Sequence, residues 1–389
     1  MALLPFDYAV RNLGRSPGRL AAILAGSTLV VLMLLTATAF VQGMRQALTL
    51  DDAARNVILL GTGSEASLER SQISAAVPSQ AMAGIPGIKQ RLGVPFVSPE
   101  IHLALVVRRA PDAAEELRAV FRGMTPTAFL VHPRVQIVAG RAPRPGHNEL
   151  LAGRLAARKL GVPDADLAPG RTLWFEGQEW TIVGRFAAPG TVMEAEIWTT
   201  LGDLQVASRR DNTLSCVILT LDTAEVADVE TWATVRLDLE LSAIAEGAYY
   251  ASLRRFYRPV QAMVWATAVL IALAGVLGGL NTLHAAFASR SRELGMLQEL
   301  GFSRSAILAN LLQEALLAGS AGGVIGCLLG RLLVHGHAVR FSMGVFALNV
   351  DALAVAIGLA GAVLVGLIGA LPPALACLRL PIPAALKAA

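Results

Sequence analysis

Charged residues are scarce in this sequence. Asp, Glu, Lys and Arg make up only 16% of its 389 residues, whereas hydrophobic residues make up 54%. Soluble globular domains carry roughly 25% charged residues. The composition therefore indicates a protein that places much of its surface in a membrane.

Cysteine is almost absent as well. Two of the three cysteines, Cys327 and Cys377, lie in long apolar segments, and Cys216 is alone in the more polar part. No disulfide framework can therefore form within that part. Cys216 stands in the apolar run 214–221, which is typical of a small buried residue.

Motifs of common catalytic sites are missing too. Residues 61–64 (GTGS) stop short of a Walker A loop, and no HExxH, CxxC or GxSxG pattern occurs. His335 and His337 form the close pair among six histidines. Two residues apart, they point to different faces of a helix, which favours solvated loop histidines over a metal site. We expect no catalytic, metal-binding or cofactor-binding residues in this chain.

Four long apolar segments are present, at 20–42, 259–288, 306–334 and 352–378. A membrane span needs about 20 apolar residues, because its backbone polar groups must all bond inside the helix. The first segment follows arginines and contains a small-residue triplet, 37–39, as a signal peptide does. Its apolar run is longer than the roughly 7–15 residues of a signal-peptide core. We therefore predict four transmembrane helices.

The spans divide the rest of the chain into five segments. We predict a cytoplasmic amphipathic helix at 1–19, an extracytoplasmic domain at 43–258, a cytoplasmic coupling helix at 289–305, a short extracytoplasmic loop at 335–351 and a cytoplasmic tail at 379–389. Lys and Arg near the spans favour cytoplasmic termini once those flanking the long domain are left out, since long domains cross regardless of charge. The predicted fold is an α-helical membrane protein with four transmembrane helices plus a large mixed α/β extracytoplasmic domain inserted between helices 1 and 2.

The large domain shows strand patterns separated by short helical ones. Strands are expected at 56–60, 95–107, 214–221 and 240–245, with helices within 79–92 and at 223–237. Two strand–helix–strand halves, far apart in sequence, are expected to pair into one unit. Between them, a β-rich subdomain is expected at about 121–210, with a helix at 152–160 and a strand pair at 172–175 and 179–183 turned at Gly177.

Polar residues inside the spans are candidates for function because they are costly in a membrane. Glu314 is the clear case, with His284 and Asn281 in the second span. Glu314 lies only about two turns into its span, where it can reach the interface or pair with Arg292 or Arg304. This position favours an interfacial structural role over a proton relay.

Two further sets of residues concern the membrane. Gly319, Gly323, Gly326 and Gly330 have the small-xxx-small spacing that lets helices approach closely, either within the chain or at a dimer face. Arg254, Arg255 and Arg258 stand with Phe256 and Tyr257 at the start of the second span. They form an interfacial anchor or a contact for anionic lipid headgroups.

The most informative segment is the charged insert between the second and third spans, SRSRELGMLQEL at 289–300. A helix at 291–300 would carry Leu294, Leu297 and Leu300 on one stripe. Charged residues surround that stripe, namely Arg290, Arg292, Glu293, Glu299 and Arg304. Gly301 is expected to end this helix, and Ser303 to cap the next one.

Residues 290–330 resemble the FtsX-like permease domain of type VII ABC transporters, the group that includes MacB, LolC, LolE and DevC. The resemblance rests on Arg-x-Arg-Glu-Leu-Gly-Met-Leu-x-x-Leu-Gly-Phe-Ser-Arg, followed by Glu314 and a glycine-rich span. Residues 371–374 and 379–387 are similar to the family's terminal motif, and 9–19 to its starting helix. Residues 138–141, 149–152 and 180–184 resemble its MacB-like periplasmic core domain.

This resemblance implies a permease subunit without a nucleotide-binding motif, in which a separate ATPase subunit carries ATP and Mg. The ATPase would dock on the coupling helix through Arg290, Arg292, Glu293, Leu294, Leu297, Glu299, Leu300 and Gly301. ATP-driven motion would then reach the periplasmic domain and move a lipid, lipoprotein, peptide or drug.

Other implied partners are a second permease copy or a related permease, a periplasmic adaptor of the membrane-fusion type, and membrane lipids. No nucleic acid is expected, and the location is the inner membrane. The alternative is a membrane sensor with a ligand-binding extracytoplasmic domain.

Overall fold

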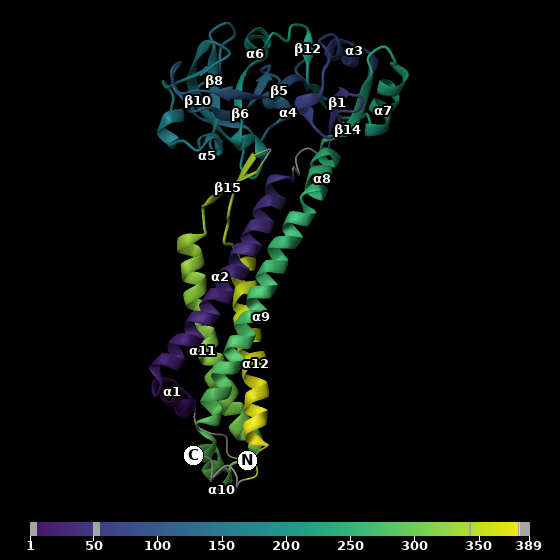
Figure 1. Ribbon diagram of the computed structural model, residues 1–389. Coiled ribbons are helices and arrows are strands. Elements are labelled where there is room, and N and C mark those ends of the chain that lie inside the picture. The colour runs from purple at the N-terminus through teal and green to yellow at the C-terminus, as the bar shows by residue number, and fades with distance from the viewer. Residues whose placement is uncertain (1–5, 50–54, 342–343, 380, 382–389) are drawn as a thin grey trace. The chain divides into compact units, whose positions relative to one another are not determined.

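The computed structural model describes residues 6–49, 55–341, 344–379 and 381 (Figure 1). Most of the predicted tail 379–389, with Lys387, lies outside the described residues, as does the start of segment 1–19. The chain forms two compact units. We call Met1–Gln42, Pro259–His337 and Leu348–Ala389 the membrane unit, and Gly43–Arg258 with Ala338–Ala347 the sheet unit.

Four helices among the described residues are long and apolar enough to cross a membrane. They are α2 (Pro17–Ala47), α9 (Arg258–Ala288), α11 (Arg304–Leu333) and α12 (Ala352–Leu378). Two shorter helices accompany them: α1 (Phe6–Gly14) precedes α2, and α10 (Ser291–Glu299) joins α9 to α11. With 27 to 31 residues each, the long helices exceed the roughly 20 residues that the hydrocarbon core requires.

Glycines bring the helices of the membrane unit into close contact. A Cβ atom placed on Gly323 would lie 2.9 Å from the Ala362 side chain of α12, and one on Gly326 would lie 2.9 Å from the Thr28 carbonyl of α2. Gly330 would meet Leu35 at 2.7 Å. Of the two alternatives for these glycines, the structure therefore gives them contacts within the chain.

The sheet unit is built on one ten-stranded sheet. Its order is β14-β1-β13-β5-β6-β11-β8-β10-β7, with β9 paired to β10. The strands are β1 (Asn56–Gly61), β5 (Val97–Val107), β6 (Leu117–Met124), β7 (Gln136–Gly140), β8 (Glu149–Gly153), β9 (Thr172–Phe175), β10 (Gln178–Ala187), β11 (Ile197–Thr200), β13 (Cys216–Thr220) and β14 (Leu241–Ala245). Short pairs β2 (Ile73–Ser74) with β12 (Thr213–Leu214), and β3 (Gln90–Arg91) with β4 (Val94–Pro95), lie beside it.

The two predicted strand–helix–strand halves interleave in this sheet. The first half is β1, α3 (Val77–Gly84) and β5; the second is β13, α7 (Val226–Val235) and β14. β13 lies between β1 and β5 and is antiparallel to both, and β1 lies between β13 and β14. Each half therefore supplies a strand that lies between the two strands of the other, which confirms the predicted pairing of the halves into one unit.

The predicted β-rich subdomain forms the other end of the same sheet. β5 joins the two ends, because Val97–Glu100 pair with β13 and Ile101–Val107 pair with β6. The β9–β10 pair and its turn at Gly177 (φ +73°) are confirmed. The helix expected from Ala152 is wrong at its start: β8 runs to Gly153, and α5 covers only Ala156–Leu160.

Short helices complete this unit: α4 (Ala128–Val131), α6 (Leu201–Ser208) and α8 (Glu246–Phe256), with single 3-10 turns at Leu68–Arg70, Asp164–Leu167 and Val192–Ala195. The expected loop 335–351 contains a hairpin, β15 (Ala338–Phe341) and β16 (Gly344–Ala347). Val345 is buried with Leu155 and Ala195. The hairpin therefore belongs to the sheet unit because it buries an apolar side chain there.

Candidate functional site

α10 is the predicted coupling helix. Gly301, at φ +92°, ends it, and the N–H groups of Gly301 and Phe302 bond to the carbonyls of Gln298 and Leu297 at 3.1 Å each. This is the hydrogen-bond pattern of a helix closed by a left-handed glycine. Ser303 then caps α11 by accepting from the Ala306 N–H at 3.2 Å. Both local predictions are confirmed.

The apolar residues of α10 lie on different faces. Leu294 is buried with Phe287 and Ile307 in the core of the membrane unit, Leu297 packs at its edge, and Leu300 is 76% exposed. The prediction of one leucine stripe is therefore wrong. At 3.6 residues per turn, each step of three residues rotates by about 60°, so Leu300 lies about 120° from Leu294.

A different face of α10 is free within the described residues. Arg292, Met296, Glu299 and Leu300 are exposed, and their spacing of four, three and one places them together on a helix. Met296 is 47% exposed. This face, which we call the free face of α10, combines two apolar side chains with one charge of each sign.

Glu293 and Arg290 turn the other way, into a cluster of charges. Glu293 accepts hydrogen bonds from the Tyr8 hydroxyl and from Arg290 Nε at 3.0 Å, and pairs with Arg15 at 3.4 Å. Burial acts to raise the pKa of Glu293, but the hydrogen bonds from Tyr8 and Arg290 outweigh it and lower the pKa. Burial and the bond to Glu293 raise the pKa of Tyr8. The cluster therefore ties α1 to α10.

Glu314 belongs to the same cluster. Its carboxylate, buried on α11, accepts from Arg290 Nη1 at 2.9 Å and pairs with Arg19 Nη2 at 3.4 Å. The predicted pairing with Arg292 or Arg304 is wrong. Arg304 stands ten residues earlier on the same helix, about 15 Å away, and Arg292 lies on the free face.

Other predicted residues lie apart from α10. Arg254 Nη1 donates to Thr49 Oγ1 at 2.9 Å within the sheet unit, and Arg255 and Arg258 are exposed. His335 Nδ1 accepts from the Val350 N–H at 3.2 Å.

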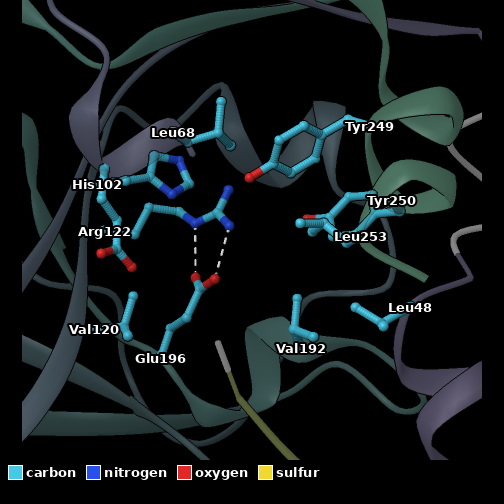
Figure 2. A pocket seen from close by; sticks show the side chains of 11 residues that line it. Leu48, Leu68, His102, Val120, Arg122, Val192, Glu196, Tyr249, Tyr250 and Leu253 are labelled. Carbon is cyan, nitrogen blue, oxygen red and sulfur yellow. Dashed lines mark hydrogen bonds and ion pairs between the residues drawn. The ribbon is translucent and has the colours of Figure 1, made fainter. Parts of the chain in front are cut away.

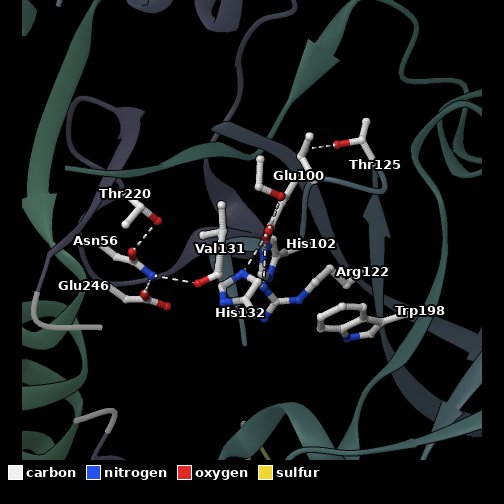
Figure 3. A network of polar contacts seen from close by, with 12 residues as sticks. Asn56, Glu100, His102, Arg122, Thr125, Val131, His132, Trp198, Thr220 and Glu246 are labelled. Atoms are coloured by element: carbon white, nitrogen blue, oxygen red, sulfur yellow. Dashed lines mark hydrogen bonds and ion pairs between the residues drawn. The ribbon is translucent and has the colours of Figure 1, made fainter. Parts of the chain in front are cut away.

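The sheet unit contains a second charge network that sequence reasoning missed (Figure 3). Arg122 of β6 is buried and binds Glu196 through Nε at 2.7 Å and Nη2 at 2.9 Å. Its Nη1 donates to Glu100 of β5 at 2.6 Å. His102 and His132 each place Nε2 3.0 Å from Glu100. Five buried polar side chains thus join β5, β6, the residue before β11 and the loop after α4.

The electrostatics of this network follow from the pairing. Burial acts to raise the pKa of Glu100, but Arg122 and His132 hold it well below its usual range. Burial acts to lower the pKa of Arg122, and the charges of Glu196 and Glu100 raise it well above its usual value. One feature of the sequence could have indicated this network. Glu100 and His102 stand two residues apart in a strand, so they share one face, while the other face of that strand is apolar.

Donor atoms of Glu100, His102 and Cys216 lie within 4.8 Å of one another, as in a metal site. The position of Arg122 disfavours a metal site. A metal ion would lie beside this buried guanidinium, which already bonds to an oxygen of Glu100. Burial also raises the pKa of the Cys216 thiol well above its usual value, which disfavours the thiolate that binds metals. We interpret the network as a buried ion-pair scaffold.

A small cavity lies beside this scaffold, between Arg122, Glu196 and the α8 residues Tyr249 and Tyr250 (Figure 2). Its volume of about 40 Å³ accommodates a few waters. Ligand pockets usually measure roughly 300–1,000 Å³. The cavity is too small for a transported molecule.

Comparison with known proteins matches both parts of the chain. Residues 20–234 match the family model of the MacB-like periplasmic core domain, and residues 265–382 match that of the FtsX-like permease C-terminal region. The macrolide export ATP-binding/permease protein MacB of Nitrobacter winogradskyi is 34% identical over 116 residues. That match covers 30% of this chain and 17% of the relative, so the chain spans about a sixth of the length of the relative it matches.

Two solved structures were also found. The periplasmic region of MacB from Actinobacillus actinomycetemcomitans aligns over 52% of this chain and 93% of its own, at 8% identity and a TM-score of 0.38. The extracellular domain of the noncanonic ABC-type transporter YknZ from Gram-positive bacteria aligns over 49% and 99%, at 15% identity and a TM-score of 0.36. The periplasmic-core family model alone covers more than half of the chain, and the chain belongs to the family of FtsX-like permeases with a MacB-like periplasmic core domain.

Proposed function

We propose that this chain is the permease subunit of a type VII ABC transporter in the inner membrane, with cytoplasmic termini. A separate ATPase subunit would bind the free face of α10 and hydrolyse ATP. The chain would transmit the resulting motion to its periplasmic core domain, which acts on a lipid, lipoprotein, peptide or drug. A second copy or a related permease, and a periplasmic adaptor, would complete the assembly.

The observation that carries this proposal is the contrast between the two faces of α10. One face is fixed to the membrane unit through Leu294 in the core and through the bonds of Glu293 and Arg290. The other exposes Met296 and Leu300 beside Arg292 and Glu299. A helix that is held firmly on one side and exposes apolar side chains on the other is suited to receive force from a protein partner.

The contrast also revises which residues should bind the partner. Arg292, Met296, Glu299 and Leu300 would contact the ATPase, whereas Arg290, Glu293 and Leu294 would position the helix. Leu297, at the edge of the core, would support both. The family membership supports an ATPase partner, and the alternative of a membrane sensor requires a different protein on this face.

The test is substitution on the free face. In the full chain, Met296→Glu and Leu300→Glu should abolish co-purification of an ATPase subunit and its stimulation by the permease, because a buried unpaired carboxylate is costly at an interface. Gln298→Glu is the matched control, since it adds the same charge to the same helix outside the free face.

Undiminished ATPase recruitment and turnover in both free-face variants would refute the docking proposal. Recovery of a stoichiometric signalling protein in place of a nucleotide-binding subunit would favour the sensor. The membrane content of each variant, measured by quantitative blotting, separates loss of docking from loss of insertion.

A further inference from the structure

An apolar cavity of about 480 Å³ lies among the four long helices of the membrane unit. α2 contributes Ala22 and Gly26 to its wall, and α9 contributes Ala274, Gly278 and Gly279. α11 and α12 close it through Ala315, Gly319, Val365 and Gly366. The cavity is thus lined by glycine, alanine and aliphatic side chains, with Ser27 and Thr282 as its polar residues.

The cavity offers water little to bind. Its lining includes the hydroxyls of Ser27 and Thr282, and each already bonds to a carbonyl of its own helix: Ser27 Oγ to Ile23 at 2.8 Å, and Thr282 Oγ1 to Gly278 at 2.9 Å. A buried water needs two to four polar partners. An apolar occupant therefore suits this space better than water does.

Three glycines of this cavity lack the close contacts found elsewhere in the spans, whereas a Cβ atom on a fourth, Gly275, would lie 2.5 Å from the Val30 side chain. A Cβ atom on Gly26, Gly278 or Gly279 would meet nothing within 4 Å, whereas one on Gly323 or Gly326 would collide at 2.9 Å. Glycine is less favourable than alanine inside a helix. Packing within the chain explains Gly323 and Gly326 but leaves Gly26, Gly278 and Gly279 unexplained, and the effect of these three glycines is to keep the space open.

Basic side chains stand near one end of the cavity. Ala22 is the first lining residue of α2, and Arg19 lies about one turn before it on the same helix. Arg15, in the turn before α2, joins the charge cluster of Arg19 through its pairing with Glu293. The Arg15 side chain is 68% exposed, and its pairing with Glu293 spans 3.4 Å. A negatively charged group at this position would be attracted by arginine while remaining in contact with water.

We propose that the cavity binds one acyl chain of an anionic phospholipid from the surrounding bilayer, with the lipid phosphate at Arg15. The occupant must be apolar over the length of the cavity and negatively charged at one end, and a phospholipid has both properties. A helix of a second copy, about 10 Å across, is too wide to enter a space of this volume between four helices.

The test uses the purified full chain in nanodiscs of equal parts phosphatidylglycerol and phosphatidylcholine. After transfer to mild detergent, native mass spectrometry counts the phospholipids that each chain retains. Wild type should retain one phosphatidylglycerol. Ala274→Leu, which fills the cavity, should reduce this retention at least fivefold.

Ala266→Leu is the matched control. Ala266 is also an exposed alanine of α9, but it is not part of the cavity wall, so this variant should retain the lipid. Arg15→Gln should remove the preference for phosphatidylglycerol over phosphatidylcholine while one acyl lipid is still retained.

Equal retention by Ala274→Leu and Ala266→Leu would overturn the proposal. A change of oligomeric state in Ala274→Leu, without a change in retained lipid, would assign the cavity to a second copy and also overturn it. So would a retained lipidated peptide in place of phospholipid. If Ala274→Leu fails to insert into the membrane, the wild-type chain is tested with spin-labelled phosphatidylglycerol instead. A spectral component from one immobilised lipid per chain would support the site, and its absence would refute the site.

Discussion

Both units of the molecule bury arginine–glutamate clusters, but they complete them differently. In the sheet unit, all three guanidinium nitrogens of Arg122 bond to Glu100 or Glu196. In the membrane unit, Arg290 bonds to Glu293 and Glu314, and its Nη2 has no partner among the described residues. The first cluster is a closed scaffold inside one sheet, whereas the second is an incomplete junction between helices.

The difference indicates that the sheet unit is held rigidly at its cluster, whereas the membrane unit can adjust at its own. A fully satisfied buried network holds its elements in one arrangement. A junction with an unused donor, such as that joining α1, α10 and α11, can exchange partners at lower cost. The membrane-unit cluster lies at the proposed entry point of force, and the closed one lies in the domain that would be moved as a body.

The largest effect is expected when the closed cluster is broken. Arg122→Met leaves Glu100 and Glu196 buried without their cation, which should lower the free energy of unfolding by about 3–5 kcal/mol. Thermal unfolding of the full chain in detergent, followed by tryptophan fluorescence, measures the loss. Arg118→Met, an exposed position on the same strand, should change it by less than about 0.5 kcal/mol. Similar losses for both variants would contradict the role of the closed cluster as a scaffold of the sheet unit.

A smaller loss is expected from filling a helix contact of the membrane unit. Gly326→Leu forces a side chain against the Thr28 carbonyl and Val31, each within 2.9 Å of the Cβ position, and overpacking costs roughly 1–3 kcal/mol. A Cβ atom on Gly278 would have no neighbour within 4 Å, so Gly278→Leu should be tolerated. The midpoint of thermal unfolding in detergent compares the two. Equal destabilisation would contradict the separation into packing and cavity glycines.

The smallest effects concern two carboxyl groups of the sheet unit with opposite pKa shifts. The bond from Arg141 lowers the pKa of Glu149 to about 2. Its stabilising contribution is therefore present above the unfolded pKa, near 4.3, and is lost as the pH falls towards 2. Glu149→Gln should flatten the acid limb of the stability profile in that window.

Burial raises the pKa of Glu246. The folded protein holds this proton more tightly than the unfolded chain does, so the contribution of Glu246 is greatest at low pH and is lost as the pH rises through its folded pKa. Glu246→Gln should therefore be at least as stable as wild type at pH 7. Thermal unfolding midpoints of wild type, Glu149→Gln and Glu246→Gln, measured from pH 3 to 8, test both carboxyl groups. If the difference between wild type and variant changed with pH in the same direction for both, the opposite pKa shifts would be disproved.

Features governed by neighbouring residues could be predicted from the sequence. The four apolar helices follow from the length of uncharged runs, and the end of α10 follows from Gly301, which adopts a left-handed conformation at little steric cost. The cap by Ser303 and the turn at Gly177 depend on equally short segments. In each case one or two residues fix the backbone locally, whatever surrounds them.

The buried networks could not be predicted in the same way. Arg122 meets Glu196, which is 74 residues away, only because β11 lies beside β6 in the sheet. Glu314 meets Arg19 across 295 residues because the start of α2 lies beside α11. Such partners depend on the order in which elements pack, and no local pattern specifies that order.

The pattern of apolar and charged residues was enough to predict a membrane protein with a large domain between its first two spans and a short charged helix between the next two. The packing of the elements settles which face of that helix is free, which glycines contact another helix, and where a cavity remains among the long helices. Hydrophobic runs and turn residues act through the nearest neighbours in the chain. The exposure of a side chain depends on every element that packs against it.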